Sequence, residues 1–417
     1  MLRLVAGGRS STPGPRIARR LDVHSPFDGR TIGAVPDFDS SGLIRSFEEA
    51  SRALHALPDG QPIREKLCNW ARKIDPQREQ LARIVSLETG KPIRFARVEV
   101  LTALTMLDSL CRGAVGPVRR DGGSRCLVFL ISNWCDPVLT MVRETVAALR
   151  SGRALIIKPS SRASLVSLTL ASLWNDGEGM DALLRVVTST DALTMLREAL
   201  QSSRVGEVRF RGTHEVGAYI SRVCIGARMP VTICTMARVS LVVDAHADAD
   251  RVCDAIVNRA FIEPMLAGVE RVSCLYVGDS VADSLLRLVV SRANGLRSGN
   301  PLDDVTDVGP VIDDVAAVIT REQVEDAIAD GATLLGEDMT FEGRQLRPII
   351  LDHVQPSMRV CNEEIEGPLL PVIRFRSLAE LPTVERDTGN VLIWSESGGH
   401  VGWTGRARHS VRHEFFN

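Results

Sequence analysis

Cysteine thiols and one lysine are the side chains whose types suggest chemistry in this sequence. The chain has 417 residues and nine cysteines, and a thiolate can attack a carbonyl carbon or bind a metal. Buried cysteines, however, more often pack as small apolar groups. Only four lysines occur, and one of them, Lys158, directly follows the apolar run 154–157. A lone lysine in such a place is as a rule exposed, so the surrounding elements must decide what it does.

The histidines show no spacing that is typical of a metal site. His409 and His413 are separated by one helical turn, but no carboxylate or third ligand accompanies them. A net charge of −2 predicts no broad basic face for nucleic acid. No apolar run reaches the roughly 18 residues that suggest a membrane span. The odd cysteine count and the lack of a C-x-x-C pattern predict reduced thiols in a cytoplasmic protein.

The elements that would position these residues alternate between strands and helices. The apolar run 126–131 predicts a buried parallel strand, which a helix at 137–150 and a strand at 154–157 follow. The remaining predicted elements are strands at 184–188, 207–210, 231–234 and 239–243, helices at 191–201 and 214–225, and a second series of helices (248–262, 281–294, 313–330) and strands (272–277, 348–351, 371–375). This alternation predicts an α/β fold with parallel sheets.

The part of the chain before the first sheet is predicted to be a hairpin followed by helices. Asp28-Gly29 forms a turn within 25–36, and Asp39 or Ser40 is expected to begin a helix that runs through Leu54. Further helices are expected at about 63–75, 77–90 and 95–111. The first 20 residues are rich in arginine and contain no acid, and we expect a flexible N-terminus over 1–24.

Several segments in sequence order resemble one known family. Residues 87–92 read L-E-T-G-K-P, 156–161 read I-I-K-P-S-S, and 210–217 read F-R-G-T-H-E-V-G. With 299–310 and 363–372, they resemble the aldehyde dehydrogenases over 25–417. The resemblance implies two Rossmann-like parallel-sheet domains. These are an NAD(P)-binding-like domain at 25–240 and a catalytic-like domain at 241–397, followed by a C-terminal tail at 398–417.

The resemblance implies that NADP or NAD is the cofactor and that Lys158 contacts its adenosine half. In that position the ammonium can bond the adenosine ribose or a 2′-phosphate. Ser161 stands where the family has an acid, and Arg162 is next to it. The loss of that carboxylate removes repulsion toward a 2′-phosphate, so NADP is at least as well accommodated as NAD.

The pyrophosphate and nicotinamide positions follow from the same resemblance. Gly212 and Thr213 lead into a helix N-terminus, whose free backbone N–H groups can hold a pyrophosphate. Arg211 replaces a small threonine that lies close to the nicotinamide in the family. Glu364 occupies the position that grips the nicotinamide ribose, and Trp134 is retained from the family's cofactor-side segment.

The family's catalytic positions are substituted. Counted back from the retained arginine of its segment, the nucleophile position is Leu266, and a leucine has no lone pair with which to attack an aldehyde. Cys135 takes the place of the oxyanion-binding asparagine, and Cys234 takes the place of the general base. Met236 and Ala237 replace a flexible Gly-Gly pair. The resemblance therefore implies that no catalytic residue is retained.

Two shortened regions concern assembly. The family's oligomerisation arms appear as a short linker, 113–124, and as a gap before residue 398, so we expect these arms to be reduced or absent. We therefore expect a monomer or an altered dimer instead of the family tetramer.

Three hypotheses for the function follow. The first is a catalytically impaired pseudoenzyme that can still bind a dinucleotide. The second is an active oxidoreductase that uses Cys234 or Cys135 as a relocated thiol nucleophile. The third is a structural or partner-binding protein without a cofactor.

Overall fold

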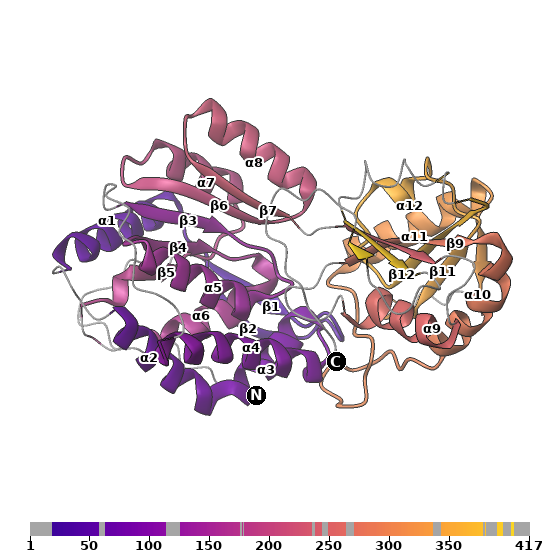
Figure 1. Ribbon diagram of the computed structural model, residues 1–417. Coiled ribbons are helices and arrows are strands. Elements are labelled where there is room, and N and C mark those ends of the chain that lie inside the picture. The colour runs from indigo at the N-terminus through magenta and orange to yellow at the C-terminus, as the bar shows by residue number, and fades with distance from the viewer. Residues whose placement is uncertain are drawn as a thin grey trace. The chain divides into compact units, whose positions relative to one another are not determined.

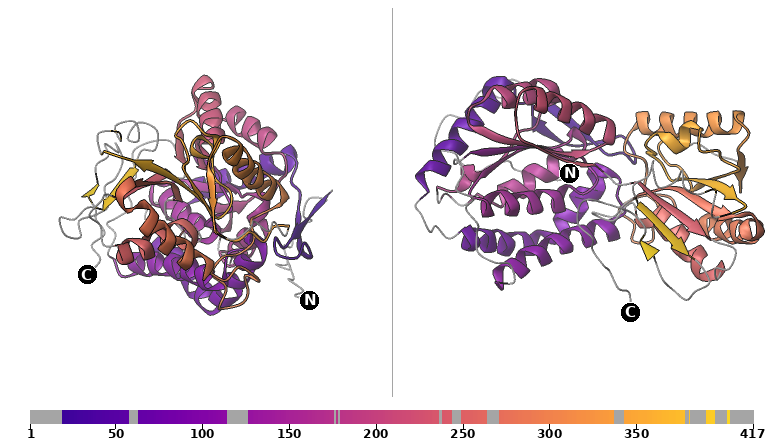
Figure 2. Two further views of the ribbon diagram at one scale, coloured as in Figure 1. Left: turned by 90° about the vertical axis from the view of Figure 1, so that its right-hand side faces the viewer. Right: turned by 45° about the horizontal axis from the view of Figure 1, so that its top comes forward.

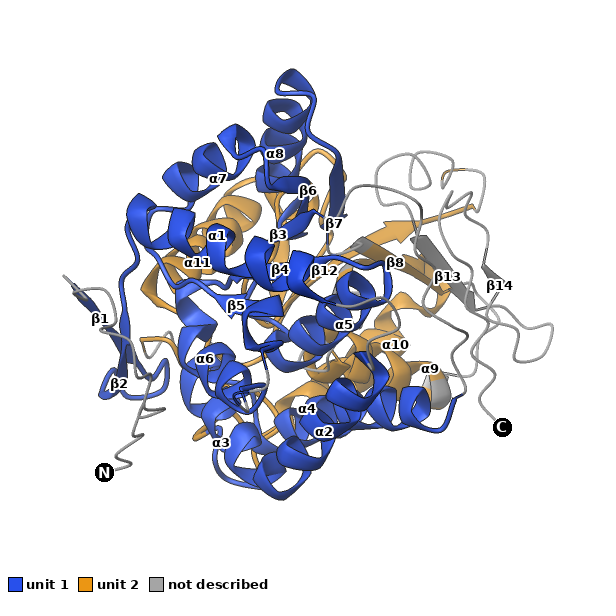
Figure 3. Cartoon of the chain, turned by 90° about the vertical axis from the view of Figure 1, so that its left-hand side faces the viewer, with its two compact units in different colours: residues 1–235, 266–268, 301–304 blue, residues 236–265, 269–300, 305–417 orange. Residues whose placement is uncertain are grey.

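The computed structural model describes residues 19–57, 63–113, 126–175, 177, 179–235, 238–243, 249–263, 271–336, 343–377, 380, 390–394 and 402–403. The chain divides into two compact units, which Figure 3 shows in blue and orange. Unit 1 consists of residues 1–235, 266–268 and 301–304, and unit 2 consists of residues 236–265, 269–300 and 305–417. Each unit contains its own mainly parallel sheet, so the α/β class predicted from the sequence is confirmed.

Within the described residues of unit 1, five parallel strands form a sheet in the order β5-β4-β3-β6-β7. Their bounds are β3 (Leu127–Ile131), β4 (Ala154–Lys158), β5 (Leu184–Val186), β6 (Val205–Gly212) and β7 (Val231–Thr235). After β3 the chain forms β4 and β5 on one side of β3, and it then crosses over and forms β6 and β7 on the other side. Doubly wound sheets bind their ligands at such a reversal of strand order, at the carboxyl ends of the strands.

Helices cover both faces of this sheet (Figure 1). One face carries α1 (Ser40–Ala56), α7 (Ala192–Gln201) and α8 (His214–Gly226), and the other carries α5 (Pro137–Arg150) and α6 (Ser164–Ser172). Three further helices, α2 (Ile63–Ile74), α3 (Arg78–Thr89) and α4 (Ile93–Cys111), pack beyond α5 and α6. Figure 2 shows the same layers in the indigo-to-magenta half of the chain. The continuously apolar sequences of β3 and β4 follow from this burial on both faces.

The N-terminal elements form as the sequence predicts. The strands β1 (Arg20–His24) and β2 (Thr31–Pro36) pair antiparallel, and Gly29 adopts the positive φ of 69° in the turn between them. Asp39 is the N-cap of α1, and its side chain accepts a hydrogen bond from the Gly42 N–H at 2.8 Å. The strand β1 begins at Arg20, inside the stretch that the sequence assigns to a flexible N-terminus.

Unit 2 contains a sheet with the strand order β10-β11-β12-β9-β8-β13-β14 in its described residues. The strands are β8 (Arg238–Val243), β9 (Arg271–Gly278), β10 (Thr333–Leu335), β11 (Ile349–Asp352), β12 (Leu369–Phe375), β13 (Asn390–Trp394) and β14 (Gly402–Trp403). The two edge strands β10 and β14 run antiparallel to their neighbours. Alternating residues build two cores: Leu241 and Val277 lie on the side of α9 (Ala249–Val257) and α10 (Asp279–Asn294), and Val242 and Tyr276 lie on the side of α11 (Asp314–Ala329).

One expectation from the sequence is wrong: Cys68 and Cys111 are not reduced thiols but form a disulfide, with a Cα–Cα distance of 5.8 Å. They are 43 residues apart in the sequence, and the packing of α2 against α4 brings them together. Cysteine spacing carries no information about that packing, so an odd cysteine count could not reveal the bond.

Two helices, α6 and α12 (Arg359–Asn362), and the two edge strands β10 and β14 are absent from the sequence predictions. The described helices include none with both the length and the apolar character that crossing a membrane requires.

Candidate functional site

The described residues of unit 1 that the sequence assigns to a cofactor or to a substituted catalytic position all lie at or just beyond the carboxyl ends of its parallel strands. Trp134 and Cys135 follow β3, Lys158 ends β4, and Ser161 lies in the turn after it. On the other side of the reversal, Gly212 ends β6, Thr213 begins α8, and Cys234 is the penultimate residue of β7. The topology therefore brings these predicted residues to one edge of one sheet.

Lys158 is buried at this edge, with 6% of its surface exposed. Its Nζ donates a hydrogen bond to the main-chain oxygen of Pro159 at 3.2 Å, and no carboxylate in the described part of the chain forms an ion pair with it. Burial lowers the pKa of this ammonium from its ordinary value, with no charged group acting on it besides. A buried cation without a counter-charge can bond ribose hydroxyls or a phosphate, so the donor chemistry fits the adenosine half of a dinucleotide.

Ser161 lies in the short 3₁₀ turn Ser161–Ala163 and is exposed. The turn is capped by Ser160, whose hydroxyl accepts a hydrogen bond from the Arg162 N–H at 3.3 Å. Ser161 thus has a freely accessible hydroxyl at the position where the resemblance places a carboxylate.

The segment from β6 into α8 has the small residues that a helix start near a ligand requires. A Cβ at Gly212 would lie 2.5 Å from Cζ of Phe210, so only glycine fits there. Thr213 is the N-cap of α8, and its hydroxyl accepts a hydrogen bond from the Val216 N–H at 3.5 Å. Gly217 packs against β7, where an added Cβ would lie 3.0 Å from Cγ2 of Ile233. The N-terminus of α8 therefore sits close to the strand ends and is capped by a small hydroxyl.

The N-termini of α5 and α6, by contrast, are occupied by carboxylates of the chain itself. Glu99 accepts hydrogen bonds from the Val138 and Leu139 N–H groups at 2.8 and 3.3 Å. Lys91 pairs with Glu99 at 2.5 Å and also donates to the main-chain oxygen of Cys135 at 2.6 Å. An anion at the start of α5 would have to displace Glu99, so this terminus is not available to a phosphate.

Glu88 caps the N-terminus of α6, as Glu99 caps the N-terminus of α5. Its two oxygens accept hydrogen bonds from the Leu165 and Val166 N–H groups at 2.7 and 2.8 Å. Burial raises the pKa of this carboxyl to about 7, against the effect of the N–H donors. Sequence reasoning used Glu88 and Lys91 only to identify the family. It missed that Glu88 caps α6 and that Lys91 pairs with Glu99. Two charged residues within an exactly matched L-E-T-G-K-P segment were the available signal.

In the described part of the chain, the loop between β3 and α5 contains two buried side-chain oxygens that accept no hydrogen bond. Asp136 is 4% exposed, and its Oδ1 accepts a hydrogen bond from the Thr140 hydroxyl at 2.9 Å. The other oxygen of Asp136, Oδ2, and Oδ1 of Asn133 have no hydrogen-bond partner among the described residues. Trp134 and Cys135 are both partly buried beside them. Buried oxygens of this kind need a donor from a ligand or a water.

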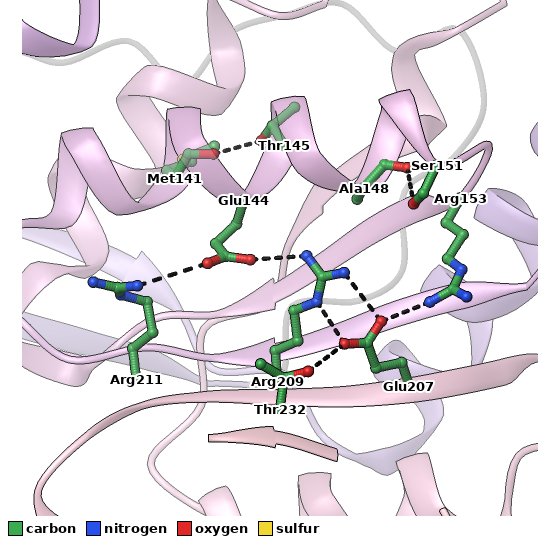
Figure 4. Close-up of polar contacts among 10 residues, drawn as sticks. All are labelled: Met141, Glu144, Thr145, Ala148, Ser151, Arg153, Glu207, Arg209, Arg211 and Thr232. Carbon is green, nitrogen blue, oxygen red and sulfur yellow. Dashed lines mark hydrogen bonds and ion pairs between the residues drawn. The ribbon is translucent and has the colours of Figure 1, made fainter. Parts of the chain in front are cut away.

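Charged residues form a network between β6 and α5 (Figure 4). Arg209 donates to Glu207 at 2.8 Å and to Glu144 of α5 at 2.9 Å. Glu207 also accepts hydrogen bonds from Arg153 at 2.6 Å and from the Thr232 hydroxyl at 2.8 Å. Charged residues at every second position, 207, 209 and 211, in and just after the predicted strand 207–210 were the signal in the sequence. They were not recognised as a network.

Arg211 is the member of this network that lies nearest the carboxyl end of β6. Its guanidinium lies 3.8 Å from Glu144 and 3.9 Å from Oδ2 of Asp136, and its side chain is 16% exposed. The buried Nε of Arg211 has no hydrogen-bond partner among the described residues. The side chain therefore extends from β6 toward the loop after β3 and is held there by charge more than by close hydrogen bonds.

The remaining predicted positions fall elsewhere. Cys234 is exposed on the edge strand β7, beside Arg211 in the strand register. Leu266, Met236 and Ala237 lie outside the described residues. In unit 2, Glu364 precedes β12 and is partly buried, and its main-chain oxygen accepts a hydrogen bond from Gln323 at 3.1 Å.

The described residues include no group of three His, Cys, Asp or Glu side chains that could hold a metal. His409 and His413 lie outside the described residues.

Comparison with known proteins identifies relatives over most of the chain. A sequence model of the aldehyde dehydrogenase family matches residues 15–389. A glutarate-semialdehyde dehydrogenase of Pseudomonas putida is 27% identical over 386 residues, which are 88% of this chain and 79% of the relative. An NADP(+) succinate-semialdehyde dehydrogenase of Escherichia coli is 26% identical over 391 residues, which are 88% of this chain and 80% of that relative.

Solved structures share the fold. An aldehyde dehydrogenase from Brucella melitensis superposes with a TM-score of 0.81 at 24% identity, covering 91% of this chain and 82% of that chain. An NAD-dependent benzaldehyde dehydrogenase from Corynebacterium glutamicum superposes with a TM-score of 0.80 at 23% identity, covering 91% and 86%. The two-unit architecture is therefore that of these proteins.

Proposed function

The chain belongs to the aldehyde dehydrogenase family, and we propose that it is a catalytically impaired member that binds an adenine dinucleotide, NADP or NAD, in unit 1. The observation that carries the binding proposal is the buried ammonium of Lys158, which has no carboxylate partner among the described residues. A cofactor held here would supply hydride chemistry in an active family member. The chain's own residues bind and orient: Lys158 for the adenosine ribose or its phosphate, and the α8 N-terminus at Gly212 and Thr213 for the pyrophosphate.

The proposal of impaired catalysis rests on the substituted positions. Leu266 cannot attack an aldehyde, and thiol groups at Cys135 and Cys234 replace an amide donor and a carboxylate base. The main-chain oxygen of Cys135 is held by Lys91, so the loop that bears this residue is fixed by a structural contact. An amide that stabilises an oxyanion typically contributes on the order of 10²-fold to 10³-fold in rate, and a thiol does not replace it.

The cofactor preference follows from Ser161. Its exposed hydroxyl adds no negative charge beside Lys158, and Arg162 follows it in the turn. A 2′-phosphate would meet positive charge and no carboxylate from this turn. We therefore expect NADP to bind at least as tightly as NAD, which parallel calorimetric titrations would measure.

An active oxidoreductase with a relocated thiol is the second candidate, and the exposure of Cys234 favours it. Its accessible sulfur is near the carboxyl end of β7, at the same sheet edge as the cofactor candidates. A structural protein that binds no cofactor is the third candidate.

The three candidates give different results in one set of measurements. Purified protein would be mixed with NAD or NADP and a panel of aldehydes, while reduced nicotinamide is followed by absorbance and acyl adducts are followed by mass spectrometry. We expect binding without turnover and without an adduct. Turnover that Cys234→Ala or Cys135→Ala abolishes would establish the second candidate, and the absence of binding by either dinucleotide would establish the third.

Assembly and location remain proposals. We expect a monomer or an altered dimer, because the family's oligomerisation arms correspond to two shortened regions and the chain covers about four fifths of its relatives' length. A cytoplasmic location stays an expectation from the sequence, and the Cys68–Cys111 disulfide counts against the reduced thiols on which it rested. Of the linker 113–124, residues 114–124 lie outside the described residues, as do residues 395–401 around the gap before residue 398. Light scattering of the purified protein measures the assembly, and a family-type tetramer would contradict the expectation.

A further inference from the structure

The network that contains Arg211 has equal numbers of positive and negative side chains, all from this chain. Three guanidinium groups and three carboxylates make up the network at β6 and α5, namely Arg153, Arg209, Arg211, Asp136, Glu144 and Glu207. All six side chains belong to unit 1. A balanced set of partly buried charges offers no net attraction to a charged ligand, in contrast to the lone ammonium of Lys158.

Arg211 and Lys158 lie on opposite sides of the reversal in strand order. Lys158 ends β4, Arg211 is the penultimate residue of β6, and β3 lies between these two strands. A dinucleotide in a doubly wound sheet extends across such a reversal, with one nucleotide on each side. If the adenosine half lies at Lys158, the other half must lie at the strand end that Arg211 occupies.

A second base could enter at β6 only by displacing Arg211. The displacement would separate the guanidinium from Asp136 and Glu144, which lie 3.9 and 3.8 Å away. Asp136 is 4% exposed and would lose its ion pair with Arg211. Removing one member of a buried charge pair leaves an uncompensated charge, which is strongly unfavourable.

We propose that Arg211 closes the β6 side of the site to a nicotinamide base, so that the ligand of this chain is an adenosine diphosphate nucleotide such as ADP-ribose. This inference rests on the proposed function, because it takes the adenosine half to bind at Lys158. Arg211 is a residue that determines specificity, and Asp136 and Glu144 position it. The intact dinucleotide binds through its ADP-ribose portion, and its nicotinamide base remains outside the site.

The test compares ligands that differ only in the nicotinamide base. ADP-ribose and NAD would be titrated calorimetrically into the full chain and into Arg211→Thr. In the unaltered protein we expect the two dissociation constants to agree within about threefold. In Arg211→Thr we expect NAD to gain about tenfold relative to ADP-ribose, which corresponds to about 1.4 kcal/mol.

Arg204→Thr is the matched control. Arg204 precedes β6 and is 43% exposed in a loose ion pair with Glu48 at 3.8 Å, so the control removes the same charge outside the site. Its ratio of NAD to ADP-ribose affinity should equal that of the unaltered protein. If Arg211→Thr unfolds, the double variant Arg211→Thr with Asp136→Asn removes the buried carboxylate charge left behind, whereas Glu144 keeps its pair with Arg209. The affinity ratio of this double variant then takes the place of the ratio of the single variant.

The outcomes separate this inference from the proposed function. An unaltered protein that binds NAD tenfold more tightly than ADP-ribose would overturn the closure by Arg211 and leave dinucleotide binding intact. An unchanged ratio in both Arg211 variants would also overturn the closure. Failure of ADP-ribose, NAD and NADP all to bind at millimolar concentration would overturn the proposed function itself, and the inference with it.

Discussion

The carboxyl ends of β4 and β6 lie at the same edge of the sheet, but they differ in whether the charged side chain there has a counter-charge within the chain. At β4, Lys158 is buried with one hydrogen bond to a main-chain oxygen and with no ion pair among the described residues. At β6, Arg211 is partly buried within a network whose carboxylates and guanidinium groups are equal in number. At the end of β4 a ligand can supply the missing counter-charge, whereas at the end of β6 carboxylates of the chain already supply it.

This difference indicates how a binding site and a structural network can be told apart. Burial of a charge is costly in either case, and a network lowers that cost by pairing within the chain. A charge that is buried without a partner has no such compensation in the free protein and is stabilised only when a ligand arrives. Substitutions at the two ends should therefore change stability in opposite directions.

The largest expected effect comes from breaking the network at β6. Glu207→Gln removes the charge that Arg209 and Arg153 share, and we expect unit 1 to lose roughly 3–5 kcal/mol of unfolding free energy. Denaturant titration combined with hydrogen exchange at β3 and β6 would measure it. Glu48→Gln is the control, since its pair with Arg204 is exposed and is expected to contribute no more than about 1 kcal/mol. Equal losses in the two variants would refute the distinction between network and surface pair.

The pH dependence of Glu88 is the next largest effect. The pKa of its buried carboxyl is about 7 in the folded chain, against an ordinary value of 4.5. A raised carboxyl pKa means that the folded state binds the proton more tightly, so this stability is present at low pH and is lost as pH rises from 4.5 through about 7. The loss amounts to roughly 3 kcal/mol.

Comparison with Glu88→Gln isolates this dependence. The stability of the unaltered protein relative to the variant should fall between pH 5 and pH 8 in denaturant titrations. Glu79→Gln on the same helix is the control: Arg97 holds the pKa of Glu79 below its ordinary value, so its small contribution has the opposite sign. A difference between the unaltered protein and Glu88→Gln that does not change with pH would contradict the prediction.

Sequence reasoning located the elements of this fold well because the relevant signals are local. The apolar runs of β3 and β4, the Asp39 cap and the turn at Gly29 each depend on a few neighbouring residues. The same reasoning placed Lys158 at a strand end, because the strand and its end are both visible in the sequence. Its burial without an ion pair is a tertiary property that the sequence does not contain.

The interpretations that failed or were missed depend on contacts between distant segments. Cys68 and Cys111 meet only because α2 packs on α4. Glu99 caps α5 across 39 positions of sequence, and Glu88 caps α6 across 77. The network of Arg209 and Glu144 likewise joins a strand to a helix that precedes it by 65 positions. No local pattern specifies such pairs, and one sequence without aligned relatives cannot reveal them.

The smallest change in stability, and the one of opposite sign, is expected at Lys158. Lys158→Met replaces a buried ammonium by an apolar group of similar length, and we expect the free protein to gain about 1 kcal/mol. Nucleotide binding should weaken at least tenfold, because a charge-assisted hydrogen bond contributes about 1.5–3 kcal/mol. Calorimetry with ADP-ribose and denaturant titration measure the two quantities on the same sample. Lys73→Met is the matched control, since Lys73 donates to the main-chain oxygen of Asn175 at 3.1 Å near the surface. It should change neither the unfolding free energy nor the nucleotide affinity by much.

A Lys158→Met protein that is less stable and binds nucleotide normally would mean that the Lys158 ammonium is stabilised by a counter-charge within the chain. The contrast between the strand ends of β4 and β6 would then be wrong.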